Sequence, residues 1–273
     1  MIRLSINEMT TYRWPFERDV ATYAEAGINA IGVWRQKLSD FGDDRGIELL
    51  TDHGLRVSNL LWAGGFTGSD GRNFRESLED AEEAIRLADA MQAGCLVIYS
   101  GARNGHTANH CRRLVRSALA ELAPMADDFG VTLAIEPMHV GCAAEWTFLT
   151  DLEETFDLIS QVDTSCLHLT FDTYHLGQVP RIVERIPDIV DRIAIVHLGD
   201  GKGAPRGEQN RCCLGEGTLP LAEMVTALID AGYTGDFDVE LFGEEVETAE
   251  YIDLIAHSQQ AFRALLGAEN CRA

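Results

Sequence analysis

The segment RESLEDAEEAIRLADAMQAGCLVIY, residues 75–99, contains one complete helix-to-strand unit of this chain. An amphipathic helix is predicted by apolar side chains that recur at three- and four-residue spacing, namely Leu78, Ala81, Ile85, Leu87, Ala88 and Met91. Gly94 is expected to end this helix, because glycine is the commonest residue just beyond a helix terminus. The short apolar run Cys95–Tyr99 then predicts a buried strand.

The same unit recurs along the whole chain. Short β-like runs are expected at Ile2–Ile6, Ala30–Trp34, Arg56–Leu61, Cys95–Tyr99, Val131–Glu136, Leu167–Asp172, Ile193–His197 and Phe237–Leu241. Glycine is expected to end four further helices, at Gly27, Gly54, Gly130 and Gly232, and a strand follows each of them within a few residues. Pro15, Pro180 and Pro220 lie near the predicted starts of three helices, where a missing N–H costs nothing.

Eight strand–helix units without a long linker indicate an α/β fold, the (β/α)8 TIM barrel, as a single domain over residues 1–273. A doubly wound open sheet is the structural alternative. No GxGxxG follows the first predicted strand, which weakens a dinucleotide-binding version of that alternative. In TIM barrels, active sites lie at the carboxyl ends of the strands, so functional residues are expected there.

The composition narrows the classes of partner. The 44 acidic and 22 basic residues give a net charge of −22, which disfavours nucleic acid and anionic membrane surfaces as partners. The start of the chain does not resemble a secretory signal, and no stretch approaches the roughly 20 apolar residues that a membrane span needs. The odd count of seven cysteines favours reduced thiols in a cytoplasmic protein. Adjacent Cys212 and Cys213 are too close for a CxxC motif and are interpreted as loop or packing residues.

Four polar residues stand at the ends of four successive predicted strands: Glu136, Asp172, His197 and Glu240. Alone, each carboxylate would be interpreted as solvated and the histidine as a core residue. Together they project from one rim of a barrel, and their negative charges would repel unless a cation or protons neutralised them. We therefore predict a site for one divalent metal ion. The mainly oxygen ligand set favours Mn²⁺, Mg²⁺ or Co²⁺, with Zn²⁺ as a further candidate.

Such a metal ion would polarise a substrate carbonyl and stabilise the enediolate formed when a neighbouring C–H loses its proton. Glu136 and Glu240 are the predicted catalytic bases. Two bases on opposite faces of a carbon give epimerisation, whereas one base that moves a proton between adjacent carbons gives aldose–ketose isomerisation.

Four segments carry a resemblance to a known family: IEP at 135–137, FDTYH at 171–175, VHLGDGKG at 196–203 followed by LGEG at 214–217, and VEL at 239–241. In this order they resemble the xylose isomerase-like TIM-barrel superfamily, in particular its sugar phosphate isomerase/epimerase branch, which includes ketose 3-epimerases. The resemblance covers nearly the whole chain. It implies one metal ion held by Glu136, Asp172, His197 and Glu240, with the two glutamates also acting as the acid/base pair.

A Gly-rich loop at residues 199–218 is expected to cover or line the site. The resemblance also implies substrate contacts by His175, which follows Asp172 by three residues, and by Arg206 in this loop. The endonuclease branch of the superfamily uses additional His and Asp ligands. This chain lacks them in VIYSG at 97–101 and in RCCLGEG at 211–217, so DNA repair is disfavoured.

Further candidate substrate-binding residues lie at or beyond predicted strand ends. Trp34 and Trp62 are expected either to stack on a sugar ring or to plug the barrel mouth, and Asn7 to bind sugar hydroxyls. Lys202 is a candidate acid near an enolate, although its Gly-flanked position also suits an exposed side chain. Asp200 is expected to orient His197 or Lys202.

The sequence thus predicts a metal-dependent isomerase or epimerase that acts on a small, uncharged carbohydrate. One alternative is a metal-dependent dehydratase of a keto-sugar or inosose-like ring, of the inosose or 3-dehydroshikimate dehydratase type. Another is a non-catalytic sugar-binding barrel, against which the retention of both Glu136 and Glu240 argues. A homo-oligomer is common in the family, but no interface stripe is visible in this sequence.

Overall fold

The computed structural model describes residues 2–162 and 164–270. In this part of the chain, eight strands pair in sequence order and all in parallel, and β1 pairs with β8 to close a barrel. Their bounds are β1 Arg3–Asn7, β2 Ala30–Trp34, β3 Arg56–Gly64, β4 Leu96–Tyr99, β5 Leu133–Ile135, β6 Leu167–Asp172, β7 Ile193–Leu198 and β8 Asp236–Val239. The predicted (β/α)8 barrel is confirmed, and each predicted strand overlaps an observed one.

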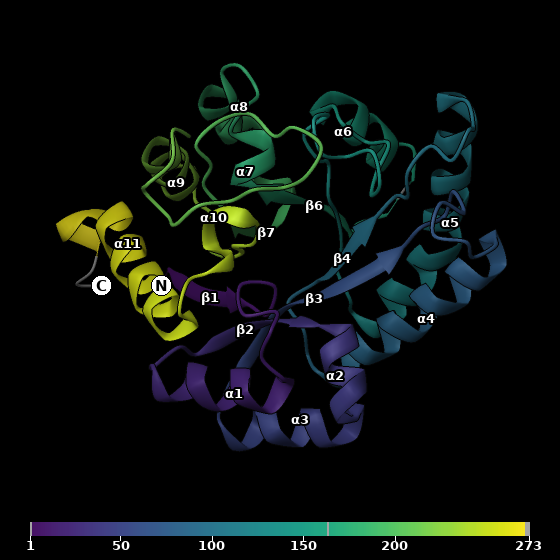
Figure 1. The fold of residues 1–273 in the computed structure, drawn as a ribbon. Helices are drawn as coiled ribbons and strands as arrows, with labels where there is room; N and C mark the ends of the chain where they lie inside the picture. The colour runs from purple at the N-terminus through teal and green to yellow at the C-terminus, as the bar shows by residue number, and fades with distance from the viewer. Residues whose placement is uncertain (1, 163, 271–273) are drawn as a thin grey trace.

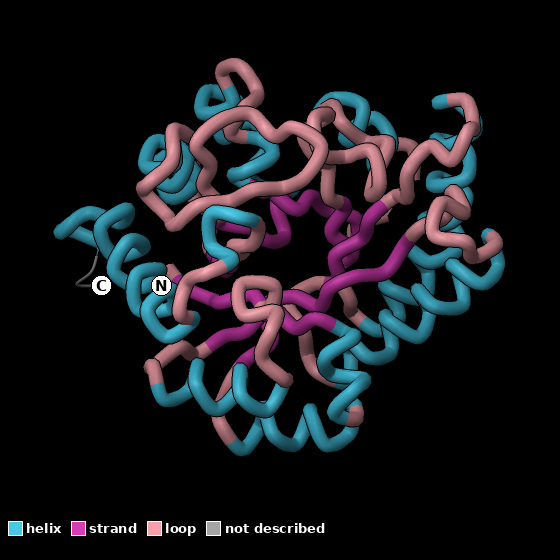
Figure 2. The backbone as a smooth tube through the Cα atoms, viewed as in Figure 1, coloured by secondary structure: helices cyan, strands magenta, loops and turns pink. Residues whose placement is uncertain are grey.

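The helices lie outside the ring of strands, and loops run across its mouth (Figures 1 and 2). Their bounds are α1 Phe16–Glu25, α2 Arg35–Phe41, α3 Asp43–Asp52, α4 Phe74–Ala90, α5 Ala108–Phe129, α6 Leu152–Ser160, α7 Thr173–Leu176, α8 Ile182–Ile189, the 3-10 helix η1 Val190–Arg192, α9 Leu221–Asp230, α10 Glu244–Glu247 and α11 Tyr251–Asn270. None of the helices in the described ranges is both long and apolar enough to cross a membrane.

Helix α4 shows how local sequence sets these elements. The Asn73 side chain accepts hydrogen bonds from the first turn, and Glu76 bonds back to the Asn73 N–H, which forms a capping box. The predicted apolar face is buried except for Leu87, which is half-buried. Gly94 does not end the helix. Helix α4 ends at Ala90, and the residue in the left-handed conformation beyond it is Gln92, with φ 50°.

Gly94 has a different role. A Cβ at this position would lie 2.5 Å from the carbonyl oxygen of Ser58, so glycine lets the chain enter β4 close beside β3. The four glycines predicted to end other helices do adopt positive φ, as Gly130 does with φ 68° after α5.

The main apolar core lies between the barrel and its helices and includes Phe16, Tyr23, Leu119 and Phe237. A smaller apolar cluster contains Leu61, Cys95, Val97, Ala134 and Ile195. The barrel also encloses a buried polar group, which includes Ser5, Asn7, Ser58, Asn59 and Asp238. The six cysteines within the described ranges are free thiols, and Cys271 lies outside those ranges.

Candidate metal centre

The four predicted ligands converge at the carboxyl ends of adjacent strands. Asp172 ends β6, His197 lies in β7, and Glu136 and Glu240 directly follow β5 and β8. All four side chains are buried, and one ligand atom from each lies within 4.8 Å of the others. His197 Nδ1 is 3.4 Å from Glu136 Oε1 and 3.5 Å from Glu240 Oε2. The barrel therefore brings residues from four distant segments into one cluster.

A hydrogen-bond network below the cluster orients the imidazole of His197. Its Nε2 lies 3.4 Å from Asn59 Oδ1, while Asn59 Nδ2 donates to Asp238 Oδ2 at 2.8 Å. Asn7 Nδ2 donates to the same Asp238 oxygen at 2.7 Å. Gly32 leaves space for this carboxylate, because a Cβ there would lie 2.4 Å from Asp238 Oδ2. The network leaves Nδ1 of His197 directed at the carboxylates.

The donor set fits a divalent cation. His197 Nδ1 is buried and has no hydrogen-bond partner among the described residues, although three carboxylates lie near it. Nitrogen and oxygen ligands at about 2.0–2.2 Å from a metal ion lie at most about 4.4 Å apart. Small side-chain movements would therefore allow Glu136, Asp172, His197 and Glu240 to hold one ion.

Charges in the cluster act on each other strongly. Burial raises the pKa of Glu240 to about 7, with Glu136 and Asp172 acting in the same direction and Arg211 and His197 against it. Burial opposes ionisation of Asp172 too, but Arg211, His175 and His197 outweigh it and lower its pKa to about 2. For His197, burial disfavours the cation, yet Glu240 and Glu136 raise its pKa to about 10. The carboxylates thus favour positive charge at this position.

Arg211 is the residue of this site that sequence reasoning missed. Its side chain is 1% exposed, and Nη2 lies 2.8 Å from Asp172 Oδ2 and 3.1 Å from Glu240 Oε2. The same Nη2 donates to Gln209 Oε1 at 2.8 Å. Its guanidinium carbon lies 4.8 Å from the centre of the Tyr174 ring. The available signal was an arginine directly before the CCLGEG run, inside the loop expected to line the site.

Arg206, the arginine expected from the resemblance, is exposed. It lines a separate cavity of about 510 Å³ together with Lys202 and Tyr174. Lys202 is also exposed and pairs with Glu245 at 2.5 Å. Asp200 contacts neither His197 nor Lys202 through a hydrogen bond: its carboxylate accepts from the backbone N–H groups of residues 201, 215 and 217. Asp200 therefore stabilises the loop and does not orient His197.

Aromatic side chains cover the cluster. A small cavity of about 40 Å³ reaches Glu136, Glu240 and Arg211, and Trp62, Trp146, Met9, Met138, Gln209 and Phe242 complete its lining. The Trp62 and Trp146 rings pack with centroids 5.8 Å apart. Trp34 lines an adjoining cavity of about 400 Å³ that both of these tryptophans share. The two predicted tryptophans therefore flank the mouth, and Trp146 joins them.

The remaining two predicted residues are buried. Asn7 is fully enclosed: its amide nitrogen bonds Asp238, and its oxygen accepts from the Met9 N–H at 2.9 Å. His175 Nδ1 lies 3.7 Å from Cys142 Sγ, and its Nε2 has no hydrogen-bond partner among the described residues. Burial lowers the pKa of His175 to about 4, although Asp172 acts against this. His175 borders a cavity of about 640 Å³ next to the cluster.

Three curated proteins are similar to this chain in sequence. D-psicose 3-epimerase of Enterocloster bolteae is 32% identical over 131 residues, which are 48% of this chain and 40% of the epimerase. Inosose isomerase of Bacillus velezensis is 29% identical over 256 residues, or 89% of this chain and 90% of the isomerase. 3-Dehydroshikimate dehydratase of Pseudomonas aeruginosa is 23% identical over 241 residues, or 83% of this chain and 36% of the dehydratase.

Solved structures share the whole fold. A protein from Sinorhizobium meliloti superimposes with a TM-score of 0.85 and 25% identity over 96% of this chain and 98% of that protein. The IOLI protein, whose structure contains a zinc atom, gives a TM-score of 0.83 and 19% identity over 97% and 98% of the two chains. The profile of the family described as xylose isomerase-like TIM barrel matches residues 20–265. The chain therefore belongs to the xylose isomerase-like TIM barrel family.

Proposed function

We propose that this protein is a divalent-metal-dependent isomerase or epimerase of a ketose or a keto-cyclitol. The observation that carries the proposal is the buried convergence of Glu136, Asp172, His197 and Glu240. Nδ1 of His197 is directed at the carboxylates and has no hydrogen-bond partner in the described part of the chain. Buried carboxylates of this number are stable only when positive charge offsets them. A metal ion bound there would polarise the substrate carbonyl and increase the acidity of the neighbouring C–H.

The protein's own groups would perform the proton transfer. Glu136 and Glu240 both line the small cavity above the cluster, so either carboxylate can face a carbon held there. Arg211 holds the Glu240 side chain at 3.1 Å and thereby fixes its position. Trp62 and Trp146 line the same cavity and would limit the access of water to an enediolate formed there.

The substrate class follows from the charges at the mouth. The guanidinium of Arg211 already pairs with Asp172 and Glu240. Among the described residues, the small cavity has no second basic side chain in its lining, and Arg35 and Arg72 of the adjoining cavity both pair with Asp80. An uncharged substrate suits this cavity better than a phosphorylated one. The alignment of 89% of this chain with an inosose isomerase favours a cyclic ketone as its substrate, and the alignment with D-psicose 3-epimerase favours a ketohexose.

The test uses metal-stripped protein reloaded separately with Mn²⁺, Mg²⁺, Co²⁺ and Zn²⁺, the last because the IOLI structure contains zinc. Each form is incubated in D₂O with free ketohexoses, inososes and 3-dehydroshikimate. The metal ion is then chelated, the protein is removed, and proton NMR spectra are recorded. We expect deuterium at the carbon next to a carbonyl, together with signals of an isomer or epimer.

A matched pair of variants gives the control. Glu240→Gln should abolish the exchange, whereas Glu244→Gln, which changes an exposed residue of the same segment, should leave it intact. A protein that binds metal but exchanges no proton in any compound would contradict the proposal and favour a sugar-binding barrel.

A second candidate is a dehydratase, which the alignment of 83% of this chain with 3-dehydroshikimate dehydratase favours. A dehydratase needs an acid that protonates the leaving hydroxyl. Lys202 lies in a separate cavity and pairs with Glu245, so it does not supply that acid in this conformation. The same NMR spectra separate the two functions, since elimination of water produces an unsaturated or deoxy ketone, or an aromatic ring from 3-dehydroshikimate, in place of an isomer.

A further inference from the structure

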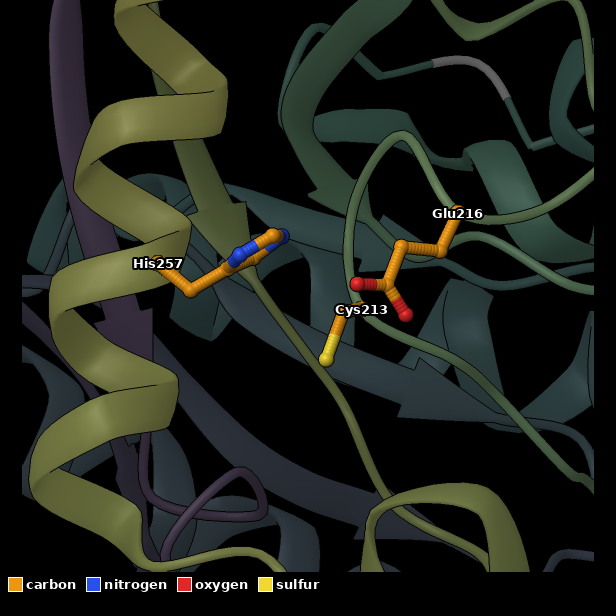
Figure 3. Close-up of side chains that lie close together, drawn as sticks. All are labelled: Cys213, Glu216 and His257. Atoms are coloured by element: carbon orange, nitrogen blue, oxygen red, sulfur yellow. The ribbon is translucent and has the colours of Figure 1, made fainter.

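A second group of metal-ligating side chains lies outside the barrel mouth, between the loop that follows β7 and helix α11. It consists of Cys213, Glu216 and His257, and one ligand atom from each lies within 4.8 Å of the others. Figure 3 shows His257 extending from its helix toward the turn that carries Cys213 and Glu216. These three residues belong to two segments that only the fold brings together.

The turn is held in place by backbone contacts. The N–H of Glu216 donates to the carbonyl oxygen of Cys213 at 3.0 Å. The Asp200 carboxylate accepts from the N–H groups of residues 215 and 217, on either side of Glu216. His257 Nε2 lies 3.1 Å from the carbonyl oxygen of Leu214, so the imidazole contacts the same turn. The protein itself thus fixes the turn and the His257 ring, whereas the side chains of Cys213 and Glu216 can still rotate.

The chemistry of this group differs from that of the barrel centre. Thiolate, imidazole and carboxylate together suit Zn²⁺ and similar borderline-soft ions, whereas the centre offers three carboxylates and one imidazole. Cys213 and His257 are half-buried and Glu216 is exposed, so solvent reaches the group. Neither the Cys213 thiol nor the Glu216 carboxylate has a hydrogen bond or ion pair with another residue of the described ranges.

The distances require only a modest adjustment. Tetrahedral ligands at about 2.0–2.3 Å from zinc lie about 3.3–3.8 Å apart, compared with the upper limit of 4.8 Å here. Rotations of the exposed Glu216 side chain and of the Cys213 thiol can close this gap. Burial raises the pKa of the Cys213 thiol. Metal binding would therefore displace a proton from its sulfur to solvent.

We propose that Cys213, Glu216 and His257 bind a second divalent ion of the zinc class, with water in the remaining position. This ion would fasten helix α11 to the loop that contains Arg211, two residues before Cys213. Arg211 contacts Asp172 and Glu240, so the second ion would stabilise the loop that completes the barrel centre. The proposal is independent of which reaction that centre performs.

Cobalt distinguishes the two sites. Co²⁺ bound to a thiolate gives an intense sulfur-to-metal charge-transfer absorption in the near ultraviolet, which an oxygen and imidazole site does not give. Metal-stripped full-length protein, kept reduced with a phosphine, is titrated with Co²⁺ alone under anaerobic conditions. Bound cobalt is counted after equilibrium dialysis. We expect two ions per chain and the charge-transfer band.

Cysteine variants assign the band. Cys213→Ser should remove it and reduce the count to one ion per chain. Cys212→Ser, which changes the adjacent buried cysteine, should retain both, and so should Cys142→Ser, whose thiol lies near the barrel centre. Glu216→Gln changes only an exposed side chain, so it keeps the fold, and should weaken the second Co²⁺ by about tenfold or more.

A measurement without cobalt completes the test. Zn²⁺ should slow the alkylation of Cys213 by iodoacetamide, as measured by peptide mass spectrometry. His257→Ala should abolish this protection. One cobalt ion per chain without a charge-transfer band, or a band that survives Cys213→Ser, would overturn the proposal.

Discussion

Replacing Arg211 by methionine should destabilise the metal-free protein far more than the metal-loaded protein. Methionine fills much of the arginine volume but removes the only guanidinium in contact with Asp172 and Glu240 among the described residues. The cluster then has three carboxylates and one imidazole. A divalent ion would compensate for the lost charge, so the damage should shrink when metal is bound.

The distances give the size of the effect. At 2.8 and 3.1 Å, an effective dielectric constant of about 20 gives a gross attraction of roughly 5–6 kcal/mol for each contact. Desolvation of the buried guanidinium cancels much of this. Breaking one side of a buried ion pair typically lowers the free energy of unfolding by about 3–5 kcal/mol. For a chain of this size, that loss lowers Tm by roughly 6–20 °C.

The assay is thermal unfolding of both proteins, first stripped of metal with a chelator and then with a saturating divalent ion. The metal-induced rise in Tm should be larger in Arg211→Met than in the parent protein. Arg206→Met is the control, because that arginine is exposed on the same loop and should change neither value. Equal losses of Tm with and without metal would refute the electrostatic argument and leave packing against Tyr174 as the cause.

Three further predictions concern the support of the site, pH and close packing. Asn59→Ala should weaken divalent-ion binding about 10–100-fold in a calorimetric titration, because Asn59 orients His197. Asn109→Ala, which changes a surface residue, should leave the affinity unchanged. An unchanged affinity in Asn59→Ala would mean that the His197 ring needs no such support. Burial raises the pKa of Asp80, but Arg35 and Arg72 outweigh it and lower that pKa below its ordinary value. The stability from this ionised group is therefore fully present above about pH 4 and is lost as pH falls through the lowered pKa. The difference between the urea midpoints of the parent and Asp80→Asn should shrink from pH 6 to pH 3; a constant difference would contradict this. Gly94→Ala should lower the free energy of unfolding by about 1–3 kcal/mol in urea, since its Cβ would lie 2.5 Å from the Ser58 carbonyl oxygen, while Gly203→Ala in open space should have no effect; equal midpoints for the two variants would contradict the steric argument.

The periodic part of the fold was predictable because burial enforces it locally. Parallel strands buried on both faces are continuous apolar runs, and the carboxyl ends of these runs meet at the barrel mouth. Glu136, Asp172, His197 and Glu240 were found in this way. The ends of the elements were harder to predict: β3 continues to Gly64, three residues beyond the predicted Leu61, because Ala63 and Gly64 pair with β4.

The position of Arg211 was not predictable, because tertiary contacts determine the path of its loop. Residues 199–218 contain no periodic pattern, and the loop turns back so that Cys212 pairs with Asp200. The N–H of Arg211 then donates to the carbonyl oxygen of Phe242 at 3.0 Å. The family resemblance pointed instead to Arg206, which this path leaves in solvent. The number of residues between two positions does not tell which of the loop residues lies against the site, because the folded path of the loop determines that.

The bonds from Asp200 to residues 201, 215 and 217 divide this loop into two parts with separate tasks. The part of the loop that these bonds close holds Arg211 against the cluster. Residues 203–208 form an outer segment that is mostly exposed. Loop closure becomes only slightly more costly as such a segment lengthens. The length and chemistry of the outer segment can therefore change, by engineering or by natural divergence, while Arg211 and the four candidate ligands keep their geometry.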